Sequence, residues 1–225
     1  MKDVVITGSE GIIGKTLSEY FINKGYSVSC LDLQLGHDLT DEGFVKDWFK
    51  NNPAKALINA FALNDHINLS ERKTGFREAA LEDFNRMLTV NLTSLFSVCR
   101  QYIIANNSGN IVNFSSIYGV VSPEPKLYAG SEKDISYGIS KAGVLQLSRH
   151  LAVHAAPSFR VNSIVLGGIE HEQGTDFIAG YSKRAPLGRM AKRTEVNGLA
   201  EFLISEESSY CTGATFTLDG GWTAI

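Results

Sequence analysis

The stretch that decides the fold is Val4-Val5-Ile6-Thr7-Gly8-Ser9-Glu10-Gly11-Ile12-Ile13-Gly14. A short apolar run leads into three glycines, and Leu17, Tyr20 and Phe21 then recur at helical spacing. Glycines let the backbone approach a pyrophosphate closely, and a helix N-terminus offers free N–H groups and a favourable dipole. Strand, glycine turn and helix together predict a dinucleotide site. The alternative is a tight turn that holds no ligand.

A second predicted strand, residues 27–31, ends at Asp32, which lies 18 residues after Gly14. A carboxylate at this position can accept hydrogen bonds from the hydroxyls of the adenosine ribose, and it repels a 2′-phosphate. No arginine or lysine stands beside Asp32, and none stands in the glycine turn before Lys15. The predicted cofactor is therefore NAD, with NADP less favoured.

The segment after Asp32 is too short for the helical crossover that would lead to the next strand of a regular parallel sheet. Only five residues separate Asp32 from Asp38, whereas a parallel crossover needs about a dozen or more. We expect the third strand to be vestigial or joined by an irregular link. Thr40 or Asp41 is then a plausible N-cap for the following amphipathic helix.

The rest of the chain alternates apolar strands and periodic helices. Strands are predicted near residues 56–60, 110–114, 160–166 and 214–218, and helices over 81–104, from Tyr137 onward and over 196–204. This order predicts an α/β fold with a doubly wound, mostly parallel sheet flanked by helices on both faces. Ligands of such sheets bind beyond the carboxyl ends of the strands.

Tyr137-Gly138-Ile139-Ser140-Lys141 carries the predicted chemistry. Residues four apart share a helix face, so the phenol lies beside the ammonium. The ordinary pKa of tyrosine is about 10, and a nearby positive charge lowers it, which prepares the phenol for proton transfer. Tyr20 and Lys24 repeat the spacing, but late in a helix and far from the ligand edge. Ser115 and Ser116 end a strand at that edge, where a hydroxyl can stabilise a developing oxyanion.

Composition narrows the classes of function. The 225 residues are 44% hydrophobic and carry a net charge of −3, which predicts neither nucleic-acid binding nor an acidic tail. The three cysteines are widely spaced, so neither a disulfide framework nor a metal site is expected. No apolar run is long enough to span a membrane and no signal peptide is recognised. We expect a cytoplasmic protein that acts on a small-molecule substrate.

Taken together, the motifs resemble those of the short-chain dehydrogenase/reductase family over nearly the whole chain. The matching segments, in chain order, are the Thr7-Gly8 turn with Gly11 and Gly14, Asp32, Asp38-Leu39-Thr40, Asn59-Ala60, Val90-Asn91, Asn113-Phe114-Ser115-Ser116, Tyr137 with Lys141, Arg160-Val161-Asn162-Ser163-Ile164, Thr212-Gly213 and Asp219-Gly220-Gly221. The resemblance implies one NAD(P)-binding Rossmann domain over residues 1–225 and a homodimer or homotetramer.

The resemblance also implies roles for individual residues. The implied catalytic tetrad is Asn91, Ser116, Tyr137 and Lys141, in which Lys141 also holds the nicotinamide ribose and Asn91 supports a water-based proton relay. Asp38 and Leu39 are expected to meet the adenine. The implied cofactor contacts are Thr7, Gly8, Ser9, Gly11, Ile12, Ile13, Gly14, Asp32, Asp38, Leu39, Asn59, Ala60, Tyr137, Lys141, Gly167 and Ile169.

Several segments depart from the family pattern. Ile12 stands where shorter members usually have glycine, Asn59-Ala60-Phe61-Ala62 replaces Asn-Asn-Ala-Gly, and Leu166-Gly167 replaces Pro-Gly. The extra segment 122–135 is expected to shape the substrate mouth, and 170–187 suits a mobile lid. Residues 116–123 are similar to members linked to bacterial surface-polysaccharide and sugar biosynthesis.

The predicted function is an NAD-dependent oxidoreductase that interconverts a carbonyl and a secondary alcohol by hydride transfer, on a sugar or sugar-derived substrate. One alternative is an enzyme like 3-oxoacyl-[acyl-carrier-protein] reductase. The non-enzymatic alternative is a cofactor-sensing binding protein of the same fold.

Overall fold

The computed structural model describes residues 2–64, 75–128 and 132–225, and within them all strands form one parallel sheet. The strand order is β2-β1-β3-β4-β5-β6, as expected for a doubly wound sheet. Their bounds are β1 (Lys2–Thr7), β2 (Val28–Leu31), β3 (Ala54–Asn59), β4 (Gly109–Ser116), β5 (Phe159–Leu166) and β6 (Thr215–Leu218). The predicted fold class is confirmed.

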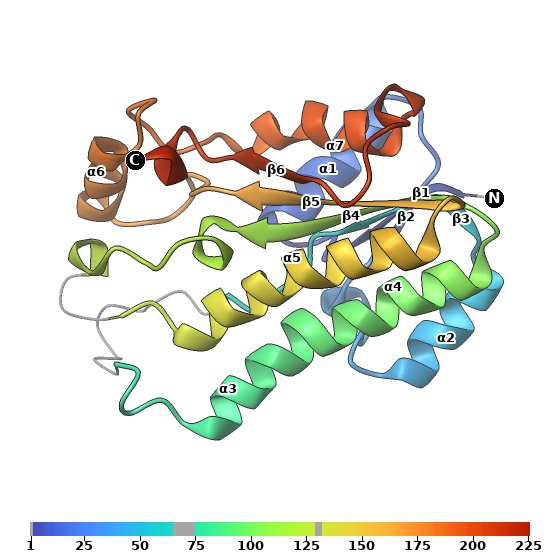
Figure 1. Ribbon diagram of the computed structural model, residues 1–225, viewed down its shortest axis with the longest axis horizontal. Coiled ribbons are helices and arrows are strands. Elements are labelled where there is room, and N and C mark those ends of the chain that lie inside the picture. Colours follow the sequence, from blue (N-terminus) through green and yellow to red (C-terminus); the bar gives the residue numbers. More distant parts are fainter. Residues whose placement is uncertain (1, 65–74, 129–131) are drawn as a thin grey trace.

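Helices cover both faces of the sheet (Figure 1). On one face lie α1 (Ile12–Asn23) and α7 (Asn197–Ile204); on the other lie α2 (Glu42–Asn51), α4 (Ser94–Ala105) and α5 (Ile135–Ala155). The remaining helices, α3 (Leu81–Leu88) and α6 (Thr175–Arg184), extend toward the end of the molecule where the strands terminate. Among the described residues no helix is both long and apolar enough to cross a membrane.

Alternate residues of a strand pack into two separate hydrophobic cores, one on each face of the sheet. Val5 packs with the helices α2, α4 and α5, whereas its neighbours Val4 and Ile6 pack with α1 and α7. Successive side chains of a strand point to opposite faces, so a strand buried on both faces reads as a continuous apolar run. This explains why the sequence signal at residues 4–6 is a run and not an alternation.

The segment after β2 turns back on itself instead of crossing over. A short 3₁₀ helix, Leu33–Leu35, ends at Gly36, whose φ of +82° favours glycine. The N–H of His37 then donates to the carbonyl of Asp32 (3.0 Å). Within the described residues no strand stands between β2 and α2, so β2 is an edge of the sheet. The short spacing between Asp32 and Asp38 thus removes the third strand of the regular pattern.

The long helix predicted over residues 81–104 contains a π-helical segment. Thr89–Thr93 joins α3 to α4 without a break in the helix. Single π turns widen a helix locally and are frequent at functional sites. Asn91, at the centre of this segment, is 2% exposed. The sequence pattern did not predict this irregularity.

A chain of buried side-chain hydrogen bonds runs across the sheet near the carboxyl ends of β1, β3 and β4. Thr7 Oγ1 donates to Asn59 Oδ1 (2.9 Å), and Asn59 Nδ2 donates to Asn113 Oδ1 (2.8 Å). Asn113 Nδ2 then donates to Ser148 Oγ on α5 (2.9 Å). The three strand residues are register partners, so this polar chain ties β1, β3 and β4 to the helix that carries Tyr137.

Asn113→Ala should lower the free energy of unfolding by about 1–3 kcal/mol, because it removes the buried hydrogen bonds that Asn113 makes with Asn59 and Ser148. Urea denaturation monitored by circular dichroism measures this. The control is Asn51→Ala on the exposed surface of α2, which should stay within about 0.5 kcal/mol. Equal effects of the two substitutions would show that the polar chain does not stabilise the sheet.

Candidate active site

The glycine turn between β1 and α1 is closely packed backbone. Gly8 has a φ of +70°, and a Cβ on it would lie 2.5 Å from backbone atoms of Phe61. A Cβ on Gly14 would lie 1.9 Å from the carbonyl oxygen of Gly8. The N–H of Gly11 donates to that same carbonyl (3.1 Å). Glycine is therefore required at Gly8 and Gly14 for the turn to close.

The turn offers donors that fit a dinucleotide phosphate. The hydroxyl of Ser9 is buried and has no hydrogen-bond partner among the described residues, although buried polar groups are normally paired. Gly11, the N-cap of α1, provides no side-chain cap for the first-turn N–H groups, to which Ile12 and Ile13 belong. A phosphate at this helix N-terminus would satisfy both features, so these residues fit a dinucleotide cofactor.

Asp32 connects the glycine turn to the end of β2. Its carboxylate accepts from the N–H of Glu10 (3.0 Å) and from the N–H of Gln34 (2.9 Å), and the residue is 9% exposed. Asp38 and Leu39, which are predicted to meet the adenine, follow in the next turn of the chain. Asp38 accepts from Thr40 within its own turn, and Leu39 is buried in the core beneath α2.

Asn59 and Ala60 lie where β3 leaves the sheet, beside the glycine turn. The side chain of Asn59 is 2% exposed and is engaged in the polar chain across the sheet. The N–H of Ala60 donates to the carbonyl of Thr7 (3.0 Å). The side-chain amide of Asn59 thus links β3 to β1 and β4 beside the glycine turn.

Tyr137 and Lys141 lie in the first two turns of α5, and Ser116 ends β4 beside them. Lys141 Nζ donates to the carbonyl of Phe114 (3.0 Å) and lies 5.9 Å from the centroid of the Tyr137 ring. Ser115 Oγ donates to the carbonyl of Lys141 (2.7 Å). Ser115 therefore fastens α5 to β4, and Ser116 is the serine close enough to the phenol of Tyr137 to oppose the rise of its pKa.

Burial dominates the electrostatics of this pair. It raises the pKa of Tyr137 to about 12, against the opposing hydrogen bond of Ser116, because the charged phenolate loses hydration. It lowers the pKa of Lys141 to about 8. The pKa of Tyr137 is therefore raised by burial and not lowered by Lys141 as predicted, and Lys141 Nζ is instead hydrogen-bonded to the carbonyl of Phe114.

Asn91 holds the loop after β3 against α5. Its Oδ1 accepts from the N–H of Leu63 (2.7 Å), and its Nδ2 donates to the carbonyl of Leu63 (2.9 Å) and to Ser140 Oγ (3.1 Å). The π-helical segment carries this amide next to the helix of Tyr137. The side chain is thus a positioning element in the protein alone.

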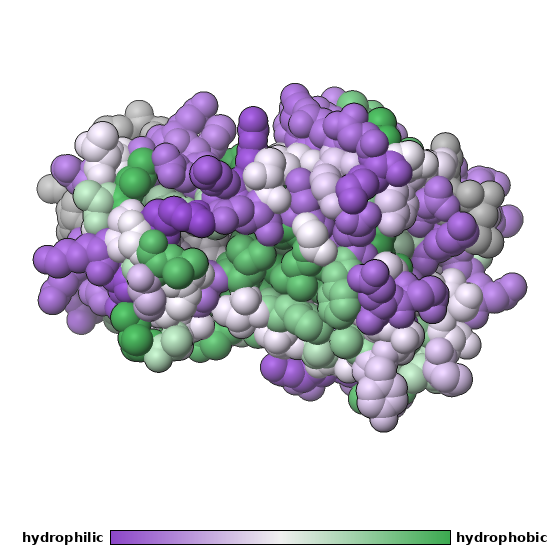
Figure 2. Space-filling model, turned by 90° about the horizontal axis from the view of Figure 1, so that it is seen from above, coloured by the Kyte–Doolittle hydropathy of each residue, from purple (hydrophilic) through white to green (hydrophobic). Residues whose placement is uncertain are grey.

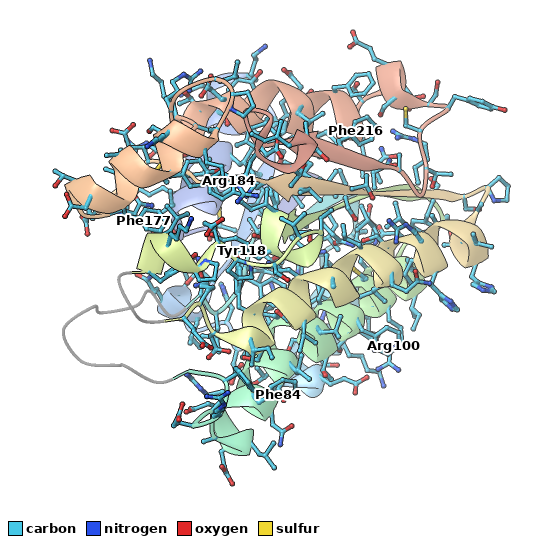
Figure 3. The ribbon with its side chains drawn as sticks, turned by 60° about the vertical axis from the view of Figure 1, so that its left-hand side comes forward. Phe84, Arg100, Tyr118, Phe177, Arg184 and Phe216 are labelled. Carbon is cyan, nitrogen blue, oxygen red and sulfur yellow. The ribbon has the colours of Figure 1, made fainter. Side chains whose placement is uncertain are left out.

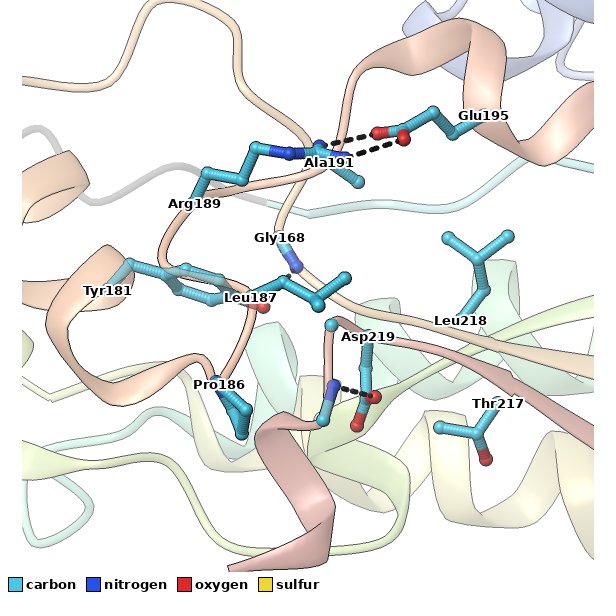
Figure 4. Close-up of a pocket in the computed structure, with 12 residues that line it drawn as sticks. Gly168, Tyr181, Pro186, Leu187, Arg189, Ala191, Glu195, Thr217, Leu218 and Asp219 are labelled. Carbon is cyan, nitrogen blue, oxygen red and sulfur yellow. Dashed lines mark hydrogen bonds and ion pairs between the residues drawn. The ribbon is translucent and has the colours of Figure 1, made fainter.

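Gly167 and Ile169 follow β5 at the same edge. The N–H of Gly168 between them donates to the hydroxyl of Tyr181 (2.6 Å), and Ile169 bridges to Ala191. A cavity of about 520 Å³ opens beside this loop (Figure 4). The predicted tetrad does not line it, whereas Gly168, Tyr181 and Asp219 do.

Sequence reasoning missed one cation of the site. Lys133 Nζ lies 4.6 Å from the centroid of the Tyr137 ring, and it donates to the side chain of Asn64. Lys133 belongs to the extra segment 122–135, of which residues 129–131 lie outside the described residues. Segment 170–187 contains α6, and its motion as a lid stays a prediction.

Comparisons with known proteins agree with this arrangement. Residues 13–223 match the family described as enoyl-(acyl carrier protein) reductase. A short-chain dehydrogenase of Leptospira borgpetersenii with bound NAD+ is 32% identical, with a TM-score of 0.89 over 99% of this chain and 92% of that one. The 3-oxoacyl-[acyl-carrier-protein] reductase of Chlamydia pneumoniae is 30% identical over 98% of this chain and 87% of its own length.

Two further relatives show the range of the similarity. The cis-4-hydroxycyclohexanecarboxylate dehydrogenase of Sinomonas cyclohexanicum is 29% identical over 98% of this chain and 96% of its own length. A longer short-chain type dehydrogenase/reductase of Sinorhizobium fredii is 28% identical over 99% of this chain, which spans 44% of that protein.

The buried ammonium predicts a pH dependence of stability without cofactor. The pKa of Lys141 is about 8 when folded and about 10.4 when unfolded. Between these values the unfolded chain binds more protons, so the free energy of unfolding of wild type relative to Lys141→Met should rise with pH. Urea denaturation from about pH 8 to about pH 10 measures this difference, and a flat difference contradicts the buried charge.

Proposed function

We propose that this chain, which belongs to the short-chain dehydrogenase/reductase family, is an NAD-dependent oxidoreductase that interconverts a secondary alcohol and a carbonyl. The observation that carries the proposal is the meeting of Ser116, Tyr137 and Lys141 at the carboxyl edge of the sheet. The glycine turn with its unpartnered Ser9 hydroxyl lies at the same edge.

Each residue of the tetrad has a role that its position supports. Tyr137 gives a proton to the carbonyl oxygen in reduction, or takes one from the hydroxyl in oxidation. Ser116 hydrogen-bonds the same oxygen as its charge changes. Lys141 supplies a positive charge below the phenol, and Asn91 fixes the helix that carries both. When bound, the nicotinamide cofactor supplies or accepts the hydride.

The cofactor is NAD in this proposal. The described residues would hold it through the glycine turn at the phosphates and Asp32 at the adenosine ribose. The Asp32 carboxylate is already fixed by the N–H groups of Glu10 and Gln34. It retains further acceptor capacity for ribose hydroxyls, and it opposes a 2′-phosphate by charge.

A sugar or sugar-derived alcohol is the proposed substrate. The edge near Tyr137 carries further phenol hydroxyls, those of Tyr118 and Tyr128, which suit a substrate with several hydroxyl groups. The similarity to 3-oxoacyl-[acyl-carrier-protein] reductases supports a second candidate, reduction of an acyl-carrier substrate. A cofactor-sensing protein without activity is the weakest alternative, because all four tetrad residues are present.

The proposed assembly is a homodimer or homotetramer. Apolar side chains of α4 and α5 are exposed, among them Phe96, Ile104, Ile139 and Val153. Figure 2 shows the other side of the molecule, that of α1, α6 and α7, where apolar side chains also gather in the middle. Extended apolar surface of this kind is typical of protein contacts.

Tyr137→Phe should reduce kcat by about 100-fold or more, because general acid–base catalysis contributes this much. NADH binding, followed by fluorescence titration, should remain nearly unchanged. Tyr20→Phe is the matched control: Tyr20 also has a lysine four residues on, but its hydroxyl donates to Glu201 (2.5 Å) away from the site. Unchanged turnover in Tyr137→Phe would remove the proposed proton donor.

Asp32→Asn should lower the ratio of kcat/KM for NAD over NADP by about tenfold, since the variant no longer repels a 2′-phosphate by charge. Steady-state rates with both cofactors measure the ratio. Asp47→Asn on the exposed surface of α2 is the control and should leave it unchanged. A wild-type enzyme that prefers NADPH would refute the assignment of Asp32.

A further inference from the structure

An ion pair joins the end of α6 to the segment between β4 and α5. Arg184, the last residue of α6, donates from Nη1 to Glu124 Oε2 (2.7 Å). Its guanidinium lies 4.7 Å from the centroid of the Trp222 ring. The two side chains of the pair are 33% and 28% exposed. The pair is therefore shielded on one side and reaches solvent on the other.

Tyr118 lies near this pair and packs against the helix of the catalytic tyrosine, since a Cβ on Gly138 would lie 2.9 Å from the carbonyl oxygen of Tyr118. Tyr118 lies two residues after Ser116, and its hydroxyl accepts from Tyr128 (2.6 Å). Burial raises the pKa of Tyr118, and the positive charge of Arg184 opposes this effect. Tyr118 in turn raises the pKa of Tyr137. Arg184 is close enough to Tyr118 to affect it by charge, and Figure 3 shows the two side chains on the same part of the molecule, beside the chain that follows Ser116.

The guanidinium is incompletely satisfied. Arg184 Nε is buried and has no hydrogen-bond partner among the described residues. A buried donor without a partner costs free energy and calls for an explanation. Arginine binds carboxylates best through two parallel N–H donors, and only one hydrogen bond joins Arg184 to Glu124. The donor set thus has capacity for a better-placed carboxylate.

We propose that Arg184 recognises a carboxylate on the substrate and that Glu124 holds this position when no substrate is bound. The substrate class is then a secondary alcohol, or the matching ketone, that also carries a carboxylate. This inference rests on the proposed function, because it concerns the substrate of the same site. Arg184 is a specificity-determining residue in this assignment, and Glu124 is its internal competitor.

The surroundings favour an anion over a neutral group. Trp222 is fully buried and stacks on Tyr181 with centroids 4.2 Å apart, while Phe177 packs against Tyr128. A partly buried guanidinium among aromatic rings needs a counter-charge. A substrate carboxylate can replace Glu124 and keep the charge paired, whereas a neutral group in the place of Glu124 would leave the guanidinium without a counter-charge.

The test compares two unreactive probes of equal shape, cyclohexanecarboxylate and cyclohexanecarboxamide, in the presence of saturating NAD+. Trp222 lies under Arg184 and its fluorescence reports binding; the other tryptophan, Trp48, is replaced by phenylalanine in every protein tested. We expect the carboxylate to bind about tenfold more tightly than the carboxamide. Glu124→Gln should strengthen carboxylate binding about tenfold, and Arg184→Gln should remove the advantage of the carboxylate.

Arg100 supplies a matched control on another part of the molecule. It also pairs with a glutamate, Glu42, lies over an aromatic ring, Phe96, and has a buried Nε without partner, but it joins α4 to α2. Arg100→Gln should leave the binding of both probes unchanged. Arg184→Lys keeps the positive charge but lacks the two parallel N–H donors of the guanidinium, so it should retain part of the preference for the carboxylate. This second variant keeps the test informative if Arg184→Gln does not fold.

The inference is overturned if both probes bind equally, if neither binds to wild type or Glu124→Gln, or if Glu124→Gln fails to strengthen carboxylate binding. Tyr137→Phe separates this outcome from failure of the proposed function. Carboxylate binding that persists in Tyr137→Phe, with turnover lost, supports both claims. Turnover that persists there, with the carboxylate preference intact, refutes only the catalytic role of Tyr137.

Discussion

The parallel direction of all six strands is the constraint on which the site depends. It brings the ends of β1, β3 and β4 to one edge, so the glycine turn, Asn59 and Ser116 become neighbours although they are far apart in sequence. Buried hydrogen bonds from Thr7 to Ser148 then fix these strands against α5. The helix that presents Tyr137 is thereby held in register with the turn proposed to bind phosphate.

Features with short-range causes could be predicted from the sequence. The apolar run before Gly8 predicts β1, and the glycine spacing predicts the turn, because steric limits act between residues close in the chain. The five-residue gap between Asp32 and Asp38 correctly predicts that a regular crossover cannot form. The parallel sheet and the ligand edge follow from the alternation of strands and helices.

Features set by contacts between distant segments could not be predicted. The spacing of Tyr137 and Lys141 shows that they are near each other, but the loss of hydration that raises the pKa of the phenol depends on the whole fold. Lys133 over the tyrosine ring and the pair of Arg184 with Glu124 join segments whose relative placement no periodicity encodes. The π-helical segment at Asn91 looks like ordinary helix in sequence.

A buried phenol and ammonium thus share one edge of a parallel sheet with the turn that is proposed to bind phosphate. Arg184, which lies over Trp222 and near Tyr118, is proposed to meet the substrate at that edge. A crystal structure with NAD+ tests this most directly. We expect the pyrophosphate on the turn from Gly8 to Gly14 and the nicotinamide beside Tyr137; a dinucleotide bound in the cavity beside Gly168, away from that turn, would contradict the proposed site.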